Sequence, residues 1–243
     1  MSDAPKTQLN QSLIDGIATL QELALSSNPV GCRELARQLQ MDPTRVNRLL
    51  QTLEHIGIAR KTAKRKYMPG PGMHVLAAQS LFASGLINHC IEPLESLKKF
   101  GHIVALGMQW RDHISYLYHA LPGMSSDQAL GRMGLYPASA GGIGMAIFST
   151  LTDSQIRAIY QHMDEIPAYP EGIEALLAEV NKTRENGYAY VETVENTRQT
   201  VAVPVGNPAF CAIGVSGWIP ATAVPEIYAE LKIVAEKIDE QTL

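Results

Sequence analysis

The sequence has few cysteines and no long apolar run. Its three cysteines (Cys32, Cys90 and Cys211) are scattered and form no C-x-x-C pair, which argues against a disulfide framework and favours a reducing compartment. No apolar run approaches the roughly 18–20 residues that span a membrane. The first twelve residues lack the charged-then-apolar pattern of an export signal. We therefore expect a cytoplasmic protein that has no membrane partner.

Patterns typical of enzymes and metal sites are also missing. Among the seven histidines, His113 and His119 share a predicted strand but lie six residues apart, which is not a metal-ligand spacing. The segment 214–217, GVSG, lacks the G-x-S-x-G spacing of a nucleophile elbow. Cys211 lies within a strand pattern, where a small core side chain is the simpler interpretation. We expect no catalytic residue, no metal and no cofactor, and an enzyme remains only as a rival class.

Charge is unevenly distributed along the 243 residues. Residues 1–80 carry ten Lys and Arg against six Asp and Glu, whereas residues 81–243 carry ten against eighteen. A basic first third joined to an acidic remainder suggests that only the first part contacts a polyanion such as DNA. The length allows one large domain or two ordinary ones.

Residues 31–57 predict two short helices joined by a tight turn. The first covers about 32–39, and the turn ends at Asp42, a good N-cap, followed by Pro43 at the first helical position. The second helix is expected to bury an apolar stripe made of Val46, Leu49, Leu50, Leu53 and Ile56. A helix pair with one apolar face and one guanidinium-and-amide face predicts a helix-turn-helix that binds a double-stranded DNA operator.

The polar face of the second helix carries side chains suited to a major groove. The predicted groove residues are Thr44, Arg45, Asn47, Arg48 and Gln51. Two short extended segments at about 58–62 and 66–69, with a cationic tip between them, predict a β-wing. The residues expected to hold phosphates or the minor groove are Arg60, Lys61, Lys64, Arg65, Lys66 and Tyr67. The simpler alternatives are an ordinary polar helix face and a solvated lysine-rich turn.

Further helices are predicted on both sides of this motif. Residues 9–27 form an amphipathic helix whose apolar side is expected to cover the helix-turn-helix, through Leu9, Leu13, Ile14, Ile17, Leu20, Leu23 and Ala24. Residues 71–85 are predicted to be an interdomain linker helix. Its exposed apolar residues would pack against a second copy, which favours a dimer.

The rest of the chain predicts an α+β domain with a largely antiparallel sheet. Alternating patterns predict strands at 102–109, 113–120, 188–194, 198–205 and 209–216. Residues 121–134 are expected to be a loop, and a helix of small residues is expected to open within 136–148. Later helices are predicted from a capping box at Thr152, from Pro170 to Gly187, and over 224–240.

Several ordered fragments carry a resemblance to a known family. In the first half they are QSL…LxxLA (11–24), RELA (33–36), VNRLLxTL…G (46–57) and YxxG (67–70). In the second half they are ASAGG (138–142), TRxxGYA (183–189), AxPV (202–205) and AIxVSG (212–217). The chain resembles the IclR-type bacterial transcriptional regulators over nearly its whole length.

This resemblance implies a three-part organisation. A winged helix-turn-helix domain would occupy 1–70, a linker helix 71–85, and a GAF-like effector-binding and oligomerisation domain 86–243. It also implies a homodimer or homotetramer that responds to a small, usually organic-acid, metabolite. The chain departs from the family pattern at Gly31, Pro137 and Ile143.

We expect the effector between the sheet and the start of the small-residue helix. Unpaired backbone N–H groups near 138–142 would hold a carboxylate there. The predicted effector residues are Leu135, Ala138, Ser139, Ala140, Gly141, Gly142, Thr200, Ala212, Gly214 and Ser216. The small residues could instead only permit close packing of the helix on the sheet. A further alternative is a DNA-binding regulator whose C-terminal domain serves only oligomerisation, without an effector.

Overall fold

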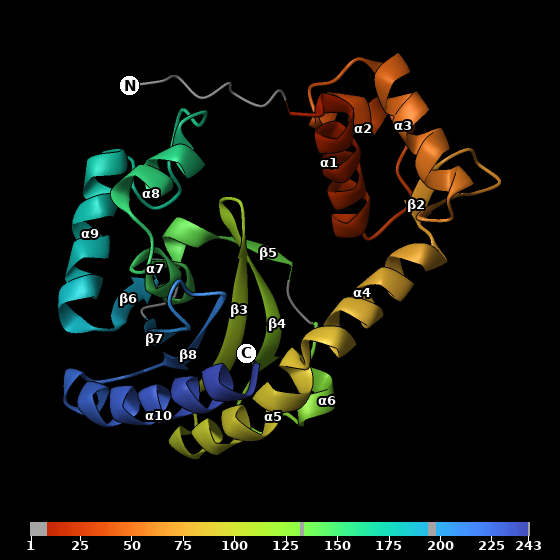
Figure 1. The fold of residues 1–243 in the computed structure, drawn as a ribbon. Helices are drawn as coiled ribbons and strands as arrows, with labels where there is room; N and C mark the ends of the chain where they lie inside the picture. The colour runs from red at the N-terminus through yellow and green to blue at the C-terminus, as the bar shows by residue number, and fades with distance from the viewer. Residues whose placement is uncertain (1–8, 132–133, 194–197, 243) are drawn as a thin grey trace, which may run out of the picture. The chain divides into compact units, whose positions relative to one another are not determined.

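The computed structural model describes residues 9–131, 134–193 and 198–242 (Figure 1). The chain divides into two compact units, Met1–Ala83 and Ser84–Leu243. None of the helices in the described part of the chain is long and apolar enough to cross a membrane.

The first unit is a small helical domain with a two-stranded wing. Its elements are α1 (Gln11–Leu25), α2 (Cys32–Gln38), α3 (Pro43–His55), β1 (Ala59–Lys61), β2 (Tyr67–Pro69) and α4 (Pro71–Ser84). The two strands pair antiparallel, with Ala59 opposite Pro69. Leu23, Leu35, Val46 and Leu50 form the centre of the core and are fully buried. The predicted helix-turn-helix, wing strands and flanking helices are thus confirmed as elements.

The orientation of α1 differs from the prediction. Its buried residues are Asp15, Thr19 and Leu23, whereas Leu13 and Ile17 are 64% and 38% exposed. At about 100° per residue, the exposed apolar pair lies on roughly the opposite side of the helix from Asp15. α1 does pack on α3, with Leu23 of the predicted apolar side fully buried in the core of this unit, but Leu13 and Ile17 of that side do not take part. The periodicity located an apolar face, but it could not say which partner that face would meet.

The second unit is built on a six-stranded sheet. Its strands are β3 (Ile103–Trp110), β4 (His113–Ala120), β5 (Leu135–Pro137), β6 (Ala189–Thr193), β7 (Arg198–Val205) and β8 (Cys211–Gly217). The order across the sheet is β5-β4-β3-β8-β7-β6, and every neighbouring pair is antiparallel. The predicted α+β class with an antiparallel sheet is confirmed.

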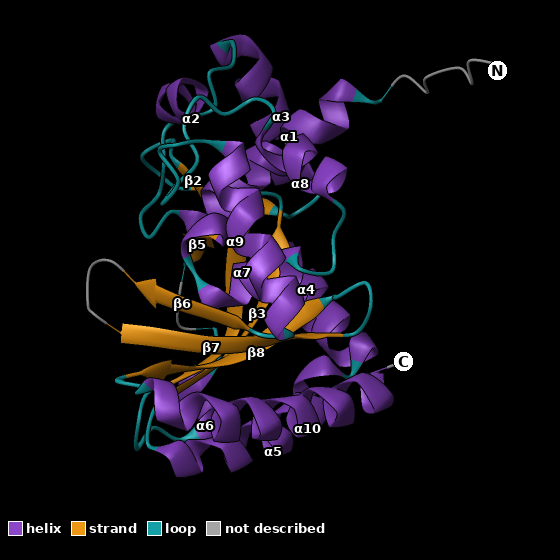
Figure 2. Cartoon of the chain, turned by 90° about the vertical axis from the view of Figure 1, so that its left-hand side faces the viewer, coloured by secondary structure: helices purple, strands orange, loops and turns teal. Residues whose placement is uncertain are grey.

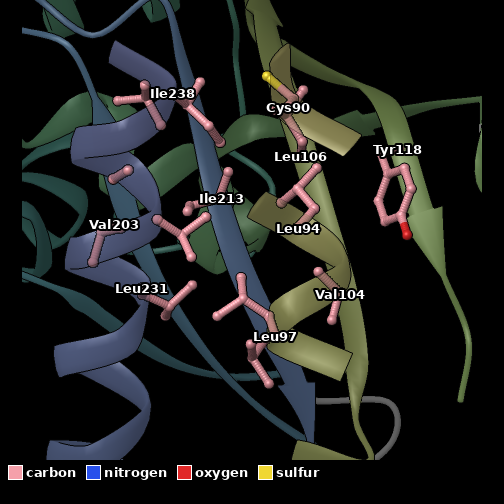
Figure 3. Close-up of a cluster of buried hydrophobic side chains, with 14 of the residues drawn as sticks. Cys90, Leu94, Leu97, Val104, Leu106, Tyr118, Val203, Ile213, Leu231 and Ile238 are labelled. Carbon is pink, nitrogen blue, oxygen red and sulfur yellow. The ribbon is translucent and has the colours of Figure 1, made fainter. Parts of the chain in front are cut away.

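One face of this sheet is covered by two long helices. They are α5 (Leu86–Ser96), continued by the 3₁₀ turn η1 (Leu97–Phe100), and α10 (Val224–Thr242), which follows the turn η3 (Ala221–Ala223). Figure 2 shows both helices on one side of β7 and β8. Leu94 from α5, Leu106 from β3 and Leu231 from α10 meet in the main core (Figure 3). This layer leaves the other face of the sheet for a second set of helices.

The opposite face carries a second core and three further helices. They are α7 (Gly142–Phe148), α8 (Asp153–Tyr160) and α9 (Ile173–Asn186), with the turn η2 (Ala138–Ala140) before α7. Thr152 caps α8 in the predicted capping box with Gln155. Met145 and Phe148 of α7 are fully buried in this core. The small-residue helix thus packs directly on the sheet.

Two local expectations need correction. The predicted loop 121–134 contains a short helix, α6 (Ser126–Ala129). Ser126 is fixed there because its Oγ donates a hydrogen bond to Oε1 of Glu95 at 2.8 Å. The small-residue helix begins only at Gly142, because the preceding residues first form the edge strand β5 and a 3₁₀ turn.

Candidate functional sites: a DNA-binding surface and a cavity

The turn of the helix-turn-helix is fixed by the residues that the sequence indicated. Oδ1 of Asp42 accepts hydrogen bonds from the backbone N–H groups of Thr44 at 2.9 Å and Arg45 at 3.1 Å, and Pro43 is the first helical residue. Val46 is fully buried, but Ile56 is 60% exposed. Its predicted burial is wrong, because Ile56 is the C-cap residue and lies about 80° around the axis from Val46.

The outward face of α3 presents most of the predicted groove residues together. Thr44, Arg48 and Gln51 are exposed, and Asn47 is half-buried. Arg45 is different, because its guanidinium forms an ion pair with the buried carboxylate of Asp15 on α1. These side chains stay a prediction as DNA contacts, and Arg45 is already engaged within the protein.

The wing presents five exposed cations. They are Arg60, Lys61, Lys64, Arg65 and Lys66. Tyr67 does not join them, because its side chain is 2% exposed and belongs to the core of the first unit. Alternation along β2 turns Tyr67 inward, where its backbone pairs with Val30. The expectation that Tyr67 holds DNA is therefore corrected, whereas the cations are free to face a phosphate backbone.

A cavity of about 610 Å³ lies in the second unit, on the α7 side of the sheet. Its walls come from β3, β4, β5, β6, β7, β8, the turn before α7 and the segment before α9. The lining residues are Ile103, Ala105, Tyr116, His119, Tyr136, Ser139, Ala140, Gly141, Gly142, Ile143, Ala168, Tyr169, Val191, Glu192, Arg198, Thr200, Gly214 and Ser216. This volume is within the range of small-molecule sites.

Seven of the ten predicted effector residues line this cavity. They are Ser139, Ala140, Gly141, Gly142, Thr200, Gly214 and Ser216. Ala138 and Ala212 are fully buried in the core beneath it. Leu135 lies outside the lining because its neighbour Tyr136 faces the cavity, and successive residues of a strand face opposite ways.

Several lining residues were missed by the sequence analysis. Tyr116 and His119 both reach the cavity although they are three residues apart on β4. A register shift between Leu106 and Gly107 of β3 breaks the alternation, so the two rings meet edge to face at 5.7 Å between centroids. Arg198 was also missed, and it places a cation in the lining where the sequence predicted only hydroxyl and backbone groups.

Hydroxyl groups make up much of the polar part of the cavity wall, beside His119, Glu192 and Arg198. Thr200 Oγ1 donates a hydrogen bond to Ser216 Oγ at 3.0 Å, and Tyr136 Oη donates one to the Ala140 carbonyl at 3.4 Å. Burial, helped by the neighbouring Tyr136, raises the pKa of Tyr116 to about 12. Burial likewise raises the pKa of Tyr169 to about 12, with a smaller contribution from Glu179. Both phenols are therefore neutral at pH 7 and can donate to a ligand oxygen.

The start of α7 differs from the anion seat that was expected. The N–H of Ala138 is not unpaired, because it donates to the Asp112 carbonyl at 2.8 Å. A Cβ on Gly142 would lie 2.7 Å from Thr200 Cγ2, so glycine there permits close packing of α7 on β7. Gly142 thus permits the close packing that the alternative describes, but it also lines the cavity, so its effector role stays a prediction.

No three His, Cys, Asp or Glu side chains of the described ranges gather as a metal site. Cys211 is fully buried, and burial raises the pKa of its thiol, as expected for a small core side chain. Neither finding offers a reactive centre.

Comparisons with known proteins agree with this arrangement. The model of the IclR helix-turn-helix domain matches residues 16–63. The chain is 24% identical over 197 residues to the acetate operon repressor of Salmonella typhimurium strain LT2. The alignment covers 77% of this chain and 71% of the repressor.

Solved structures show the same fold across both units. An IclR family transcriptional regulator from Brucella abortus superposes with a TM-score of 0.77 at 19% identity, covering 97% of this chain and 94% of that one. An IclR homologue from Microbacterium hydrocarbonoxydans, crystallised in complex with 4-hydroxybenzoate, gives a TM-score of 0.68 at 14% identity, covering 96% and 99%. The chain thus contains an IclR helix-turn-helix domain at residues 16–63, and both of its units resemble those of IclR-family transcriptional regulators.

Proposed function

We propose that this regulator binds a double-stranded operator through α3 and the wing, and that a small organic acid in the cavity of the second unit changes its operator affinity. The observation that carries the proposal is the cavity itself. It has the size of a small-molecule site, and seven residues that the sequence predicted for an effector lie on its wall. The alternative, a second unit that serves only oligomerisation, gives this cavity no role.

The DNA-binding surface supports two kinds of contact. Arg48, Gln51 and Thr44 lie on the exposed face of α3, where they can meet base edges in a major groove. The exposed cations of the wing, such as Lys64, suit the phosphate backbone. Affinity from the wing would therefore be insensitive to sequence, and discrimination would come from α3.

The cavity lining supports a small acid with an apolar body. Ile103, Ile143 and Val191 supply apolar walls, while neutral phenols and the Thr200–Ser216 pair supply hydrogen bonds. Arg198 places a positive charge in the lining that can attract a carboxylate, although Glu192 adds a negative charge to the same lining. The 4-hydroxybenzoate held by the Microbacterium homologue is a ligand of this kind, which supports testing aromatic acids first.

Self-association is supported by α1 and α4. The exposed apolar residues of these helices include Leu13, Ile17, Val75, Leu76 and Phe82, the last at 81% exposure. No Asp, Glu, Lys or Arg occurs between Lys66 and Glu92. Such an uncharged, apolar surface favours a second copy of the chain, giving a homodimer or homotetramer that places two α3 helices on two half-sites.

In this proposal the parts have separate roles. Residues 1–70 bind DNA, the helix over 71–85 links the parts, and residues 86–243 bind the effector and oligomerise. The protein would act in the cytoplasm, where a bacterial chromosome lies.

Fluorescence anisotropy on DNA from upstream of its own gene and on scrambled DNA tests the DNA-binding part. We expect a specific-over-random ratio of about 10³ or more, with affinity falling steeply as salt rises. Arg48→Ala should lower this ratio, whereas Lys64→Ala should weaken binding to operator and scrambled DNA equally. Equal loss on both DNAs for both variants would contradict the assignment of Arg48.

A thermal-shift screen of organic acids, 4-hydroxybenzoate included, tests the cavity. An effector should raise the melting temperature and change operator affinity together, because coupling between two sites is reciprocal. Thr200→Val removes one hydroxyl of the cavity wall and should weaken both responses, while Thr222→Val, at an exposed position of η3 outside the cavity lining, serves as a matched control. If acids change neither quantity, the oligomerisation-only alternative is correct.

A further inference from the structure

The first turn of α3 is attached to α1 through a single ion pair. Nη2 of Arg45 contacts Oδ2 of Asp15, whose side chain is only 7% exposed. The other carboxylate oxygen, Oδ1, accepts a hydrogen bond from Nε2 of Gln11 at 2.8 Å. Both oxygens of this buried carboxylate thus have partners, and Arg45 supplies the charge that balances it.

The position of Arg45 on α3 separates it from the groove face. At about 100° per residue, Thr44, Arg48 and Gln51 point within about 40° of the direction opposite the buried Val46. Arg45 lies about 100° to one side of Val46, on the flank where α1 packs. The Arg45 side chain remains 45% exposed, but its guanidinium is held toward α1 by Asp15.

The same turn is also fixed through its backbone. The N–H of Arg45 donates to Oδ1 of Asp42, the N-cap of α3, at 3.1 Å. Asp42 therefore fixes the start of the helix, and Asp15 fixes the direction of the Arg45 side chain at the third helical position. Arg48, on the next turn of the groove face, is placed to meet base edges, because recognition helices contact bases with their N-terminal part.

A charge that is balanced within the protein does not act on DNA in the way a free one does. Each cation that neutralises a phosphate releases a counterion and adds to the salt dependence of binding. The Arg45 charge is already compensated by Asp15, and removing it from that buried carboxylate is unfavourable. Arg45 should therefore add nothing to the salt dependence, in contrast to Lys64 on the wing.

We propose that Arg45 is a positioning residue: its ion pair with Asp15 sets the orientation of α3 for base recognition and keeps the Arg45 charge away from the phosphate backbone. This inference rests on the proposed DNA-binding function. It assigns Asp15, a buried residue of α1 that is not itself predicted to contact DNA, a role in operator discrimination.

The test is a salt series of anisotropy titrations on the full chain, with operator and scrambled DNA. Arg45→Gln should lower the specific-over-random ratio about tenfold and leave the salt slope unchanged. Asp15→Asn should release the Arg45 charge, make the slope steeper by about 0.9, and strengthen binding to scrambled DNA. Lys64→Ala is the matched control, and its slope should become shallower by about 0.9.

The outcomes separate this inference from the function on which it rests. A shallower slope for Arg45→Gln, like that of Lys64→Ala, would show that Arg45 contacts a phosphate and would overturn the proposal, as would an unchanged ratio. If one of the single variants is too unstable to titrate, the double variant Asp15→Asn/Arg45→Gln, which removes both charges, is titrated instead. Its salt slope should equal that of the wild type, and its specific-over-random ratio should be lowered. Equal binding of the wild type to both DNAs would overturn the proposed function and this inference together.

Discussion

Ser139 Oγ donates a hydrogen bond of 2.7 Å to the carbonyl oxygen of Pro167. Ser139 lies in the turn before α7 and is 1% exposed, whereas Pro167 lies in the segment between α8 and α9. The next two residues of that segment, Ala168 and Tyr169, line the cavity. This hydrogen bond therefore holds one wall of the cavity against the start of α7.

Ser139→Ala should loosen that wall. Removing the donor takes away a partly buried hydrogen bond, which costs about 0.5–1.5 kcal/mol of unfolding free energy. We also expect weaker binding of any effector found by thermal shift. Urea unfolding followed by tryptophan fluorescence measures the stability, because Trp110 and Trp218 both lie in the second unit. Ser154→Ala, at an exposed position of α8, is the control, and an equal effect of the two changes would contradict the role of Ser139.

Gly70→Ala should destabilise the first unit. A Cβ at this position would lie 2.5 Å from the Gly57 carbonyl oxygen and 2.9 Å from backbone atoms of Ala59, so the chain entering α4 would have to move away from the wing. Gly16→Ala is the contrast, because its Cβ would lie 3.8 Å from Leu49 and in ordinary contact. Because Gly16 lies within α1, Gly16→Ala should raise the unfolding free energy of the first unit by about 0.5–1 kcal/mol.

Far-UV circular dichroism against urea measures this pair, since the first unit has no tryptophan. The helical signal of Gly70→Ala should be lost at lower urea than that of the wild type, while tryptophan fluorescence changes little. If Gly70→Ala and Gly16→Ala unfolded at the same urea concentration, the close contact at Gly70 would not limit the stability of the first unit.

The sequence was most informative where local chemistry decides the structure. Asp42 followed by Pro43 predicts a helix start on its own, because the side chain caps the helix and the ring fixes φ. Hydrophobic periodicity likewise predicts that Val46 and Leu50 are buried. These features depend on residues close in sequence, and so they could be derived without a structure.

The sequence was least informative where segments that are distant along the chain come into contact. The face of α1 was misassigned because Asp15 finds a counter-charge on α3, which no periodicity reveals. The cavity residues Tyr116, His119 and Arg198 were missed because a register shift and strand pairing bring them to the site. Small residues such as Gly214 were predicted from the sequence as part of the cavity lining, but the larger lining residues were not.

Glu95 gives the second unit a dependence on acid pH. Its Oε1 receives hydrogen bonds from Tyr118 Oη at 2.5 Å and Ser126 Oγ at 2.8 Å, and Lys98 Nζ lies at 2.6 Å. Partial burial pushes the pKa of Glu95 upward, but the hydrogen bonds from Lys98, Tyr118 and Ser126 outweigh it and hold the pKa below the ordinary value. A lowered folded pKa means that the contribution to stability is full above the unfolded pKa of about 4.3 and is lost as pH falls through the folded value.

Glu95→Gln should therefore be less stable than the wild type at pH 6, and the difference should shrink below about pH 4.3. Fluorescence-monitored urea unfolding at several pH values measures it. Glu236→Gln, at an exposed position of α10, provides the control and should show no such convergence. A difference that stays constant down to pH 3 would exclude a charged role for Glu95.

Tyr67→Phe separates a role in the core from a role at the DNA interface. The Tyr67 hydroxyl is buried and has no hydrogen-bond partner among the residues that the structure describes. Losing it should leave the unfolding free energy unchanged or raise it by up to about 1 kcal/mol, because an unsatisfied buried hydroxyl is unfavourable. Tyr67→Ala should instead cost about 3–5 kcal/mol by leaving a cavity under the wing. Anisotropy on operator DNA should give the wild-type affinity for Tyr67→Phe, while Lys64→Ala binds more weakly. If Tyr67→Phe lost as much affinity as Lys64→Ala, the hydroxyl would have to reach DNA, and the wing would have to open when it binds.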